Sequence, residues 1–291
     1  MEAPADVGTY PNLLTVDVED WFHLLDIPSV PPVREWHAIE SRVVRNTNVL
    51  LDILDTHNVT ATFFVLGWIG FHFPALVCEV ERRGHEIATH GYSHQPLTEL
   101  TPQALYHDIA RSLKSLSPLC SHPIRGYRAP GFSLTTQTLW ALDVLLDLGL
   151  AYDSSAFPAR RTCRGISPIP TYQVTPKGRQ IMEFPATPLR IGKHDMFLSG
   201  GGYFRLCPYS VLVASIRHNQ KKGWGSLVYL HPRDVDISTP RLPMSLYRRF
   251  ITNVGAGSTP RKLSGLLSEF PFTSIAAVLE RSQLDPNHAV K

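Results

Sequence analysis

The chain has 291 residues, of which 43% are hydrophobic and 18% are charged, and its formal net charge is +3. This length suits one α/β barrel, and the composition is typical of a soluble protein with a sizeable core. So small a net charge gives no reason to expect binding to nucleic acid or to a membrane surface. Four scattered cysteines without a CxxC pair indicate free thiols, not a thiolate metal site or a disulfide framework.

Apolar stretches of strand length alternate with segments of helical periodicity along most of the chain. Seven strands are predicted, at residues 13–18, 60–66, 85–89, 124–127, 150–153, 181–184 and 227–230. Helices are predicted at residues 43–54, 74–84, 102–116, 133–149, 208–223, 245–251 and 261–270. This alternation predicts an α/β fold in which a mainly parallel sheet is wrapped by helices.

A single domain is expected over residues 12–281, between a flexible N-terminus (1–11) and a flexible tail (282–291). Residues 158–177 contain several prolines and basic residues with little periodicity, which predicts a long loop over one end of the barrel. The polar start lacks the pattern of a signal peptide, and no stretch of about 18 apolar residues is present. We therefore expect no membrane span and a cytoplasmic location.

Ionisable side chains gather just after five of the predicted strands, where barrel enzymes carry their chemistry. The segments are Asp17-Val18-Glu19-Asp20-Trp21, His90-Gly91-Tyr92-Ser93-His94, Arg125 to Phe132, Asp153-Ser154-Ser155, and His231-Pro232. Such a gathering predicts a polar site at one end of the barrel.

His90 and His94 are four residues apart, so a helical turn would project both imidazoles to one side. Alone, this spacing is also compatible with two surface histidines that flank a glycine turn. A carboxylate at a neighbouring strand end would complete the two-imidazole, one-carboxylate set of a hydrolytic zinc site with an open position.

Three acids follow the first strand. Strand alternation places Asp17 and Glu19 on one side, so one can ligate a metal while the other takes a proton from water. Asp20 is then the residue more apt to point away, although Glu19 and Asp20 both stay open as the ligand at this point.

Taken together and in this order, these residues resemble the polysaccharide deacetylase family, also called the NodB-homology family or carbohydrate esterase family 4. The matching motifs are Asp17-Val18-Glu19, His90 to His94, Arg128-Ala129-Pro130, Asp153 and Leu230-His231, supported by Ala61-Thr62-Phe63-Phe64 and Gly84-His85-Glu86-Ile87. The chain departs from the common pattern in having a residue between the two acids, and in having Gly131 where many members have an aromatic. From about residue 182 it resembles a subfamily associated with exopolysaccharide biosynthesis.

The resemblance implies a distorted, incomplete (β/α) barrel of about seven strands. It implies a metal-dependent hydrolase that removes the acetyl group from an N-acetylated amino sugar or polysaccharide. One divalent cation, with Zn²⁺ the first expectation and Co²⁺, Ni²⁺ or Mn²⁺ as alternatives, would be held by Glu19, His90 and His94. Asp17 would act as general base and His231 as general acid.

The remaining expectations concern supporting residues. Arg128 would hold Asp17 ionised, Asp153 would orient His231, and a backbone N–H near Gly131 would face the developing oxyanion. Substrate contacts are expected from Trp21, Tyr127, Phe132 and Tyr203, which could equally be core aromatics. Residues 199–202 fit either a phosphate-binding loop or a flexible turn. Two other readings are a cyclic-amide hydrolase similar to allantoinases and an inactive carbohydrate-binding barrel.

Overall fold

The computed structural model describes residues 10–284, except 26, 159–166, 168, 188, 192–193, 197–199 and 241. Its main sheet has the strand order β10-β1-β2-β3-β4-β5-β7-β6, with β11 paired to β1. All the pairs are parallel except β6 with β7. The strands are β1 (Asn12–Val18), β2 (Thr62–Val65), β3 (Glu86–Thr89), β4 (Gly126–Tyr127), β5 (Tyr152–Asp153), β6 (Thr171–Val174), β7 (Gln180–Glu183), β10 (Leu227–Leu230) and β11 (Phe272–Thr273).

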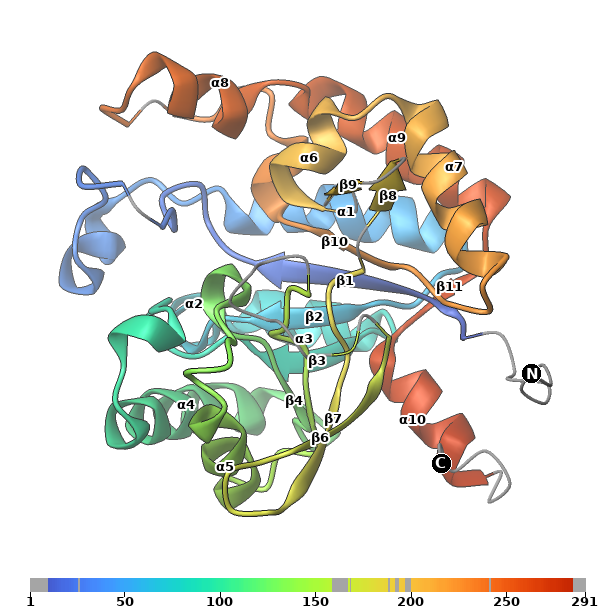
Figure 1. The fold of residues 1–291 in the computed structure, drawn as a ribbon. Helices are drawn as coiled ribbons and strands as arrows, with labels where there is room; N and C mark the ends of the chain where they lie inside the picture. The colour runs from blue at the N-terminus through green and yellow to red at the C-terminus, as the bar shows by residue number, and fades with distance from the viewer. Residues whose placement is uncertain are drawn as a thin grey trace, which may run out of the picture.

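Helices cover the curled sheet, which forms an open half-barrel (Figure 1). They are α1 (Val43–Thr56), α2 (Gly67–His72), α3 (Pro74–Arg82), α4 (Pro102–Leu116), α5 (Trp140–Asp147), α6 (Gly201–Leu206), α7 (Tyr209–Gln220), α8 (Leu246–Asn253), α9 (Thr259–Glu269) and α10 (Ile275–Leu284). A short antiparallel hairpin, β8 (Leu189–Ile191) with β9 (His194–Met196), stands apart from the main sheet. The predicted α/β class and partial barrel are therefore correct.

The centre of the sheet is the most deeply buried part of the fold. Every residue of β1 is buried, and so is every residue of β2. Strand β1 pairs with β10 on one side and with β2 on the other, so Val16 lies opposite both Leu230 and Phe63. Apolar runs of this kind are typical of strands covered on both faces. Side chains at the carboxyl end of β1 therefore lie in the middle of the molecule.

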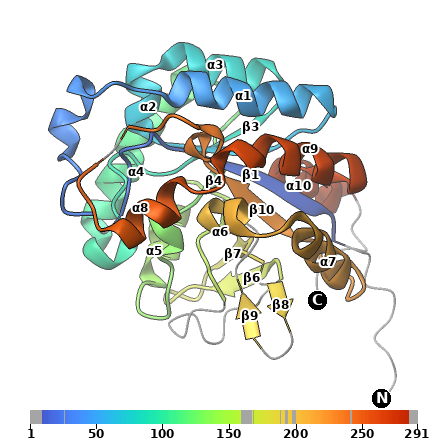
Figure 2. The same cartoon turned by 90° about the horizontal axis from the view of Figure 1, so that it is seen from above.

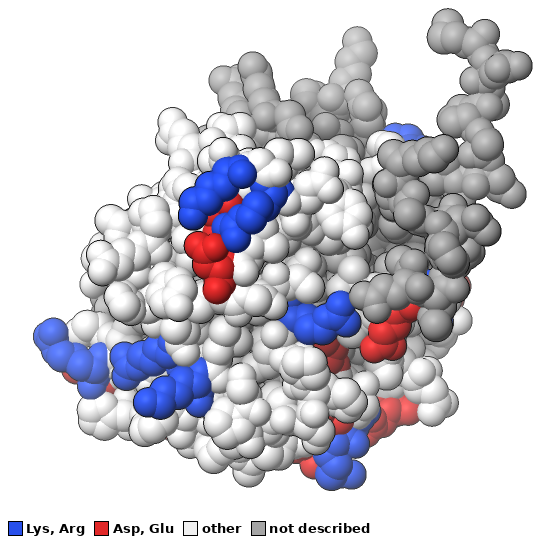
Figure 3. All heavy atoms as spheres, turned by 90° about the horizontal axis from the view of Figure 1, so that it is seen from below, with Lys and Arg blue, Asp and Glu red and all other residues white. Residues whose placement is uncertain are grey.

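The carboxyl end of β1 points to the side of the molecule where α8 lies (Figure 1). Figure 2 shows α8 from above. Short 3₁₀ turns line this end, among them η1 (Val33–Ala38), η2 (Leu97–Glu99), η4 (Pro130–Phe132) and η6 (Pro232–Val235). None of the helices described is long and apolar enough to cross a membrane. On the face in Figure 3, positive and negative side chains lie beside one another.

Several element predictions were wrong in detail. Ser133 does not begin a helix; its hydroxyl accepts a hydrogen bond from the Leu97 N–H, and α5 starts at Trp140. The predicted loop at 158–177 contains β6, which extends the sheet edge, while residues 159–166 lie outside the described part. Residues 201 and 202 belong to α6, not to a flexible turn.

The predicted termini were also imprecise. Helix α10 runs to Leu284, past the predicted domain end at 281, and residues 1–9 and 285–291 lie outside the described part. Both β11 and α10 escaped the pattern search because each is short or has a weak apolar face.

Candidate active site

The loop from His90 to His94 brings two imidazoles together without forming a helix. Gly91 has φ 74° and His94 has φ 55°, both in the left-handed region. Asp108 on α4 fixes the turn by accepting hydrogen bonds from the N–H groups of Tyr92 (2.7 Å) and Ser93 (3.1 Å). The expected helical turn is thus replaced by a loop, and a carboxylate distant in sequence holds its shape.

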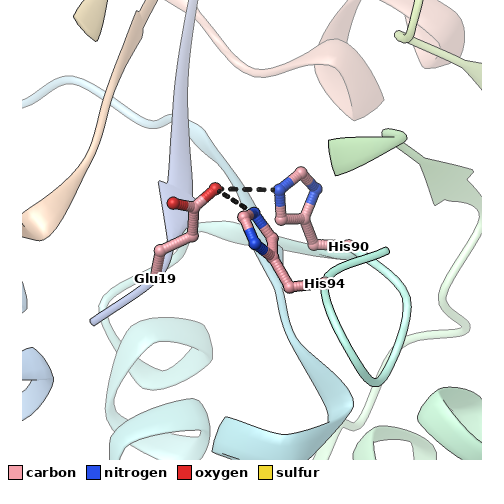
Figure 4. Close-up of side chains that lie close together, drawn as sticks. All are labelled: Glu19, His90 and His94. Atoms are coloured by element: carbon pink, nitrogen blue, oxygen red, sulfur yellow. Dashed lines mark hydrogen bonds and ion pairs between the residues drawn. The ribbon is translucent and has the colours of Figure 1, made fainter. Parts of the chain in front are cut away.

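Glu19, His90 and His94 form one cluster at the carboxyl ends of β1 and β3 (Figure 4). Glu19 Oε1 lies 3.1 Å from His90 Nε2 and 2.8 Å from His94 Nε2, and all three residues are buried. Burial would raise the pKa of Glu19, but the charges of His94 and His231 and hydrogen bonds from His90 and His94 hold it well below its usual range. A carboxylate and two imidazole nitrogens that converge on one point suit a divalent cation.

A contact with the backbone of Arg128 orients the His90 ring for metal binding. Its Nδ1 lies 2.8 Å from the carbonyl oxygen of Arg128. Because a carbonyl only accepts, Nδ1 carries the proton, and in the neutral ring Nε2 is left with its lone pair toward Glu19. The residues present therefore fit a metal site on the chemistry and direction of their donor atoms.

Asp20 points away from this cluster, and its carboxylate caps the N-terminus of α1. Its carboxylate accepts from the N–H groups of Trp21 (2.8 Å) and Arg42 (3.1 Å) and from the Ser41 hydroxyl. Burial raises the pKa of Asp20 in spite of these hydrogen bonds. The structure thus places Glu19, and not Asp20, with the histidines.

Asp17 is held by Arg128 in a fully buried ion pair. Arg128 Nη1 donates to Asp17 Oδ1 at 2.6 Å, and Arg128 has no exposed surface. The guanidinium also donates to the hydroxyl of Thr15 (2.8 Å) and to the carbonyl (3.0 Å) and hydroxyl (2.8 Å) of Ser154, and it lies over the ring of Phe64. A buried guanidinium held by this many acceptors fixes the position of the Asp17 carboxyl group.

His231 faces Asp17 and Glu19 from the end of β10. Its Nε2 lies 4.0 Å from Asp17 Oδ2 and 4.0 Å from Glu19 Oε1. Its Nδ1 lies 3.1 Å from Asp234 Oδ2, which also accepts from the His231 backbone N–H at 2.8 Å. Burial disfavours the charged ring, but Glu19 and Asp234 outweigh it and raise the pKa of His231. The Asp234 carboxyl has a pKa of about 2, because His231 and Arg205 overcome its burial.

The prediction that Asp153 orients His231 is therefore wrong, since Asp234 does so. Asp153 instead pairs with Glu183, its neighbour across β5 and β7, and both are fully buried. Burial and the charge of Asp153 raise the pKa of Glu183 well above its usual range, so the pair shares one proton. Asp153 accepts from the Ser155 hydroxyl at 2.5 Å, and Ser155 accepts from the Ala129 N–H at 2.7 Å. Asp153 thus supports the segment next to Arg128.

The turn after Ala129 presents one backbone donor. Gly131 has φ 66°, and the Phe132 N–H donates to the carbonyl of Ala129 at 3.0 Å. Within the described part of the chain the Gly131 N–H has no such acceptor, and Gly131 lines the cleft. Of the two N–H groups, that of Gly131 is therefore the one that a group bound in the cleft could use.

Comparisons with known proteins concern the sequence and the fold. Residues 38–152 match the polysaccharide deacetylase family, and residues 154–280 match a domain of unknown function, DUF3473. The predicted resemblance to the polysaccharide deacetylase family is confirmed over the first of these segments. The second match contributes β6, β7, β10 and β11 to the same sheet as the first, so the two matched segments share one sheet.

Two curated relatives are deacetylases. The peptidoglycan-N-acetylglucosamine deacetylase of Bacillus cereus is 35% identical over 98 residues, which is 33% of this chain and 36% of that protein. A chitooligosaccharide deacetylase of Bradyrhizobium is 31% identical over 97 residues, or 33% and 42% of the two chains. The chain thus matches well under half of the length of either relative.

Two solved structures share the fold. A Mycobacterium smegmatis structure assigned to the polysaccharide deacetylases has a TM-score of 0.65 and 18% identity, covering 97% of this chain and 93% of that one. A carbohydrate esterase family 4 pseudoenzyme of Bacillus anthracis has a TM-score of 0.51 and 11% identity, covering 93% and 66%. At these identities the likeness concerns the fold.

A cleft of about 850 Å³ opens over the cluster of Glu19, His90 and His94. Gly131, Phe132 and Tyr203 line it, as expected for substrate contacts, and Tyr203 is exposed. Trp21 and Tyr127 do not line it. Trp21 is buried and donates from Nε1 to the Glu40 carbonyl, and Tyr127 is buried in the core. Trp21 and Tyr127 are therefore core aromatics.

Other cleft residues were missed by the sequence analysis. They are His23, Tyr229, Arg233, Tyr247, Arg248 and Phe250. Asp234 was missed as well, although the three-residue spacing from His231 within one turn could have suggested a partner. Burial lowers the pKa of His23 well below its usual range, and the His23 Nδ1 accepts from the Asp20 N–H at 3.0 Å.

Proposed function

We propose that this chain is a metal-dependent hydrolase that removes the acetyl group from an N-acetylated amino sugar, alone or within a polymer. One arrangement carries the proposal: Asp17 and His231 flank the donor cluster of Glu19, His90 and His94 inside a cleft. Amide hydrolysis needs a base for water and an acid for the amine, and these two residues lie where both can act.

The residues have distinct tasks. A divalent cation held by Glu19, His90 and His94 would supply Lewis acidity to water and to the acetamide carbonyl, with Zn²⁺ the first candidate and Co²⁺, Ni²⁺ or Mn²⁺ alternatives. Asp17, which is paired with Arg128 through Oδ1, accepts the proton of the attacking water at its Oδ2 side. The Gly131 N–H donates to the oxygen that gains charge as the carbonyl becomes tetrahedral.

His231 completes the reaction by donating its Nε2 proton to the departing amine. Asp234 holds the ring through Nδ1, which directs Nε2 into the cleft toward Asp17 and Glu19. The raised pKa of His231 keeps this proton available near neutral pH. Tyr203, Phe132 and neighbouring aromatics would contact the faces of sugar rings.

The test is acetate release from a set of N-acetylated saccharides, measured with the purified chain before and after chelation and with each divalent cation restored. Acetate that disappears on chelation and returns with the cation supports the proposal. Ring opening of a cyclic ureide without acetate release would instead identify a cyclic-amide hydrolase. Saccharide binding without turnover at any cation would identify an inactive barrel.

A further inference from the structure

Arg233 is a cation in the cleft wall that lacks a carboxylate partner in the described part of the chain. It lies in η6, two residues after His231, is partly buried, and lines both the cleft and a small cavity beside Trp21. Its Nε and Nη1 are buried with no hydrogen-bond partner. Buried guanidinium donors without acceptors cost free energy, so their presence calls for an anion that the protein itself does not supply.

The nearby carboxylates are already engaged. Asp234 forms an ion pair with Arg205 at 3.0 Å through Oδ1 and accepts from His231 through Oδ2. Asp236 is paired with Arg45 at 2.9 Å and accepts from Asn46 and Ser238. Asp17 belongs to Arg128. Glu19 lies with His90 and His94, and Glu99, the remaining acid that lines the cleft, forms no ion pair with Arg233 in the described part of the chain.

A second cation lines the same cleft. Arg248 on α8 is exposed, and its guanidinium forms no ion pair within the described residues. Several arginines outside the cleft are paired, as Arg217 is with Glu269 and Arg83 is with Asp52 and Asp55. Positive and negative side chains also lie side by side on the face in Figure 3. The cleft itself is lined by two guanidinium groups that have no carboxylate partner among the described residues.

We infer that Arg233, assisted by Arg248, forms a subsite for an anionic group, a carboxylate or a phosphoryl group, on the saccharide that the cleft takes. This inference rests on the proposed function and narrows its substrate to acidic N-acetylated saccharides. The cleft volume of about 850 Å³ leaves room beyond one acetamido sugar. Arg233 follows His231 by two residues, and two residues of backbone span at most about 7 Å. The anionic group would therefore lie on the sugar that is deacetylated or on its neighbour.

The guanidinium suits this role because its planar fork of N–H donors matches a carboxylate or phosphate bidentately. In a partly buried wall the attraction is screened less by salt than at the open surface. Arg248, being exposed, should add a weaker and more salt-sensitive contribution.

The experiment uses two matched oligosaccharides with the same N-acetylglucosamine unit, one with a neutral neighbouring sugar and one with a uronic acid there. For the wild-type chain, we expect kcat/KM and calorimetric affinity to favour the acidic oligosaccharide by about tenfold or more. Arg233→Gln should bring both ratios close to one, and Arg248→Gln should lower them less. Inorganic phosphate should compete with the acidic oligosaccharide only.

Arg217→Gln is the matched control, because it removes the same charge from a paired arginine on α7, outside the cleft lining. It should leave both ratios unchanged. Equal affinity of the wild-type chain for the two oligosaccharides, or a preference that survives Arg233→Gln, would overturn the inference. The affinities need no turnover, so an absence of acetate release counts against the proposed function alone.

Discussion

The two residues proposed to transfer protons are held in opposite ways. Asp17 depends on Arg128, which is fixed by groups from β1 and from Ser154 after β5, so partners far apart in sequence converge on it. His231 depends on Asp234, three residues further along the same turn. The base side is thus built by the tertiary fold, and the acid side by local chain geometry.

This difference predicts how each side responds to damage. The base side is fully buried, so a lost partner leaves a charge without compensation inside the fold. On the acid side Asp234 is buried too, but it keeps Arg205 as a partner when His231 is changed, and His231 lines the cleft, where water or substrate can replace a missing contact. We therefore expect base-side variants to affect folding and activity together, and acid-side variants to affect mainly the chemistry.

The first prediction compares the two residues themselves. Asp17→Asn and His231→Ala should each lower kcat on an acetamide by about 10²- to 10⁴-fold while keeping bound metal. With an activated acetate ester, whose leaving group needs no proton, His231→Ala should recover much of its rate and Asp17→Asn should not. Steady-state kinetics on both substrates checks this. Equal losses on amide and ester for His231→Ala would mean that His231 only positions substrate.

Breaking the base-side pair should destabilise the fold most. Arg128→Gln leaves Asp17 buried without its cation, which should cost about 3–5 kcal/mol in the free energy of unfolding. His231→Gln should cost clearly less, because Asp234 keeps its ion pair with Arg205 and no buried charge is left without a partner. Urea unfolding of both variants gives the comparison, and equal losses would remove the distinction between the two sides.

Asp234→Asn should act on the pH profile instead. The Asp234 charge raises the pKa of His231, so its removal should move the alkaline limb of kcat to lower pH. Asp153→Asn should leave that limb in place, because Asp153 pairs with Glu183 and not with His231. A shift in Asp153→Asn and none in Asp234→Asn would reverse the assignment of the orienting acid.

The smallest effect concerns the Asp153–Glu183 pair. The pKa of Glu183 is raised well above 4.5, so the stability contributed by its protonated form is complete below that pH and is lost as the pH rises through its folded-state value. Glu183→Gln keeps a donor toward Asp153 and an acceptor for the Ala156 N–H, yet does not titrate. The Tm of this variant relative to wild type should therefore rise by a few degrees from pH 5 to pH 8. A Tm difference that does not change with pH would show that Asp153 and Glu183 share no proton.

The sequence predicted the central part of the fold well and its later part less well. Strands β1, β2, β3 and β10 are continuous apolar runs, so their pattern was readable, and the acids and histidines after them appeared in the site. Strand β6, with alternating partly exposed residues and several nearby prolines, offered no such pattern. Motif order located the candidate residues, while the convergence of His90 and His94 depended on Asp108, which no spacing rule indicates.

Partnerships were harder to predict than positions. Asp153 lies at a strand end, as His231 does, but the sheet places Glu183 beside it, and only the register of β5 with β7 reveals this. Tyr127 and Trp21 lie next to site residues in sequence and are both buried in the core. For Tyr127, at the end of β4, the reason is that neighbouring strand residues face opposite sides. Arg233 belongs to none of the motifs found in the sequence. It became a candidate for binding an anionic group only because the carboxylates around it are paired with other side chains.

The identity of the carboxylate ligand is the most direct test of the site. Metal content should be measured by elemental analysis after dialysis in the wild-type chain, Glu19→Gln and Asp20→Asn, with circular dichroism to verify folding. Glu19→Gln should lose most of its metal and remain folded. Asp20→Asn should keep one metal per chain and lose about 1 kcal/mol of stability, because Asp20 caps α1. Full metal in Glu19→Gln, or metal lost from folded Asp20→Asn, would contradict the proposed cluster of Glu19, His90 and His94.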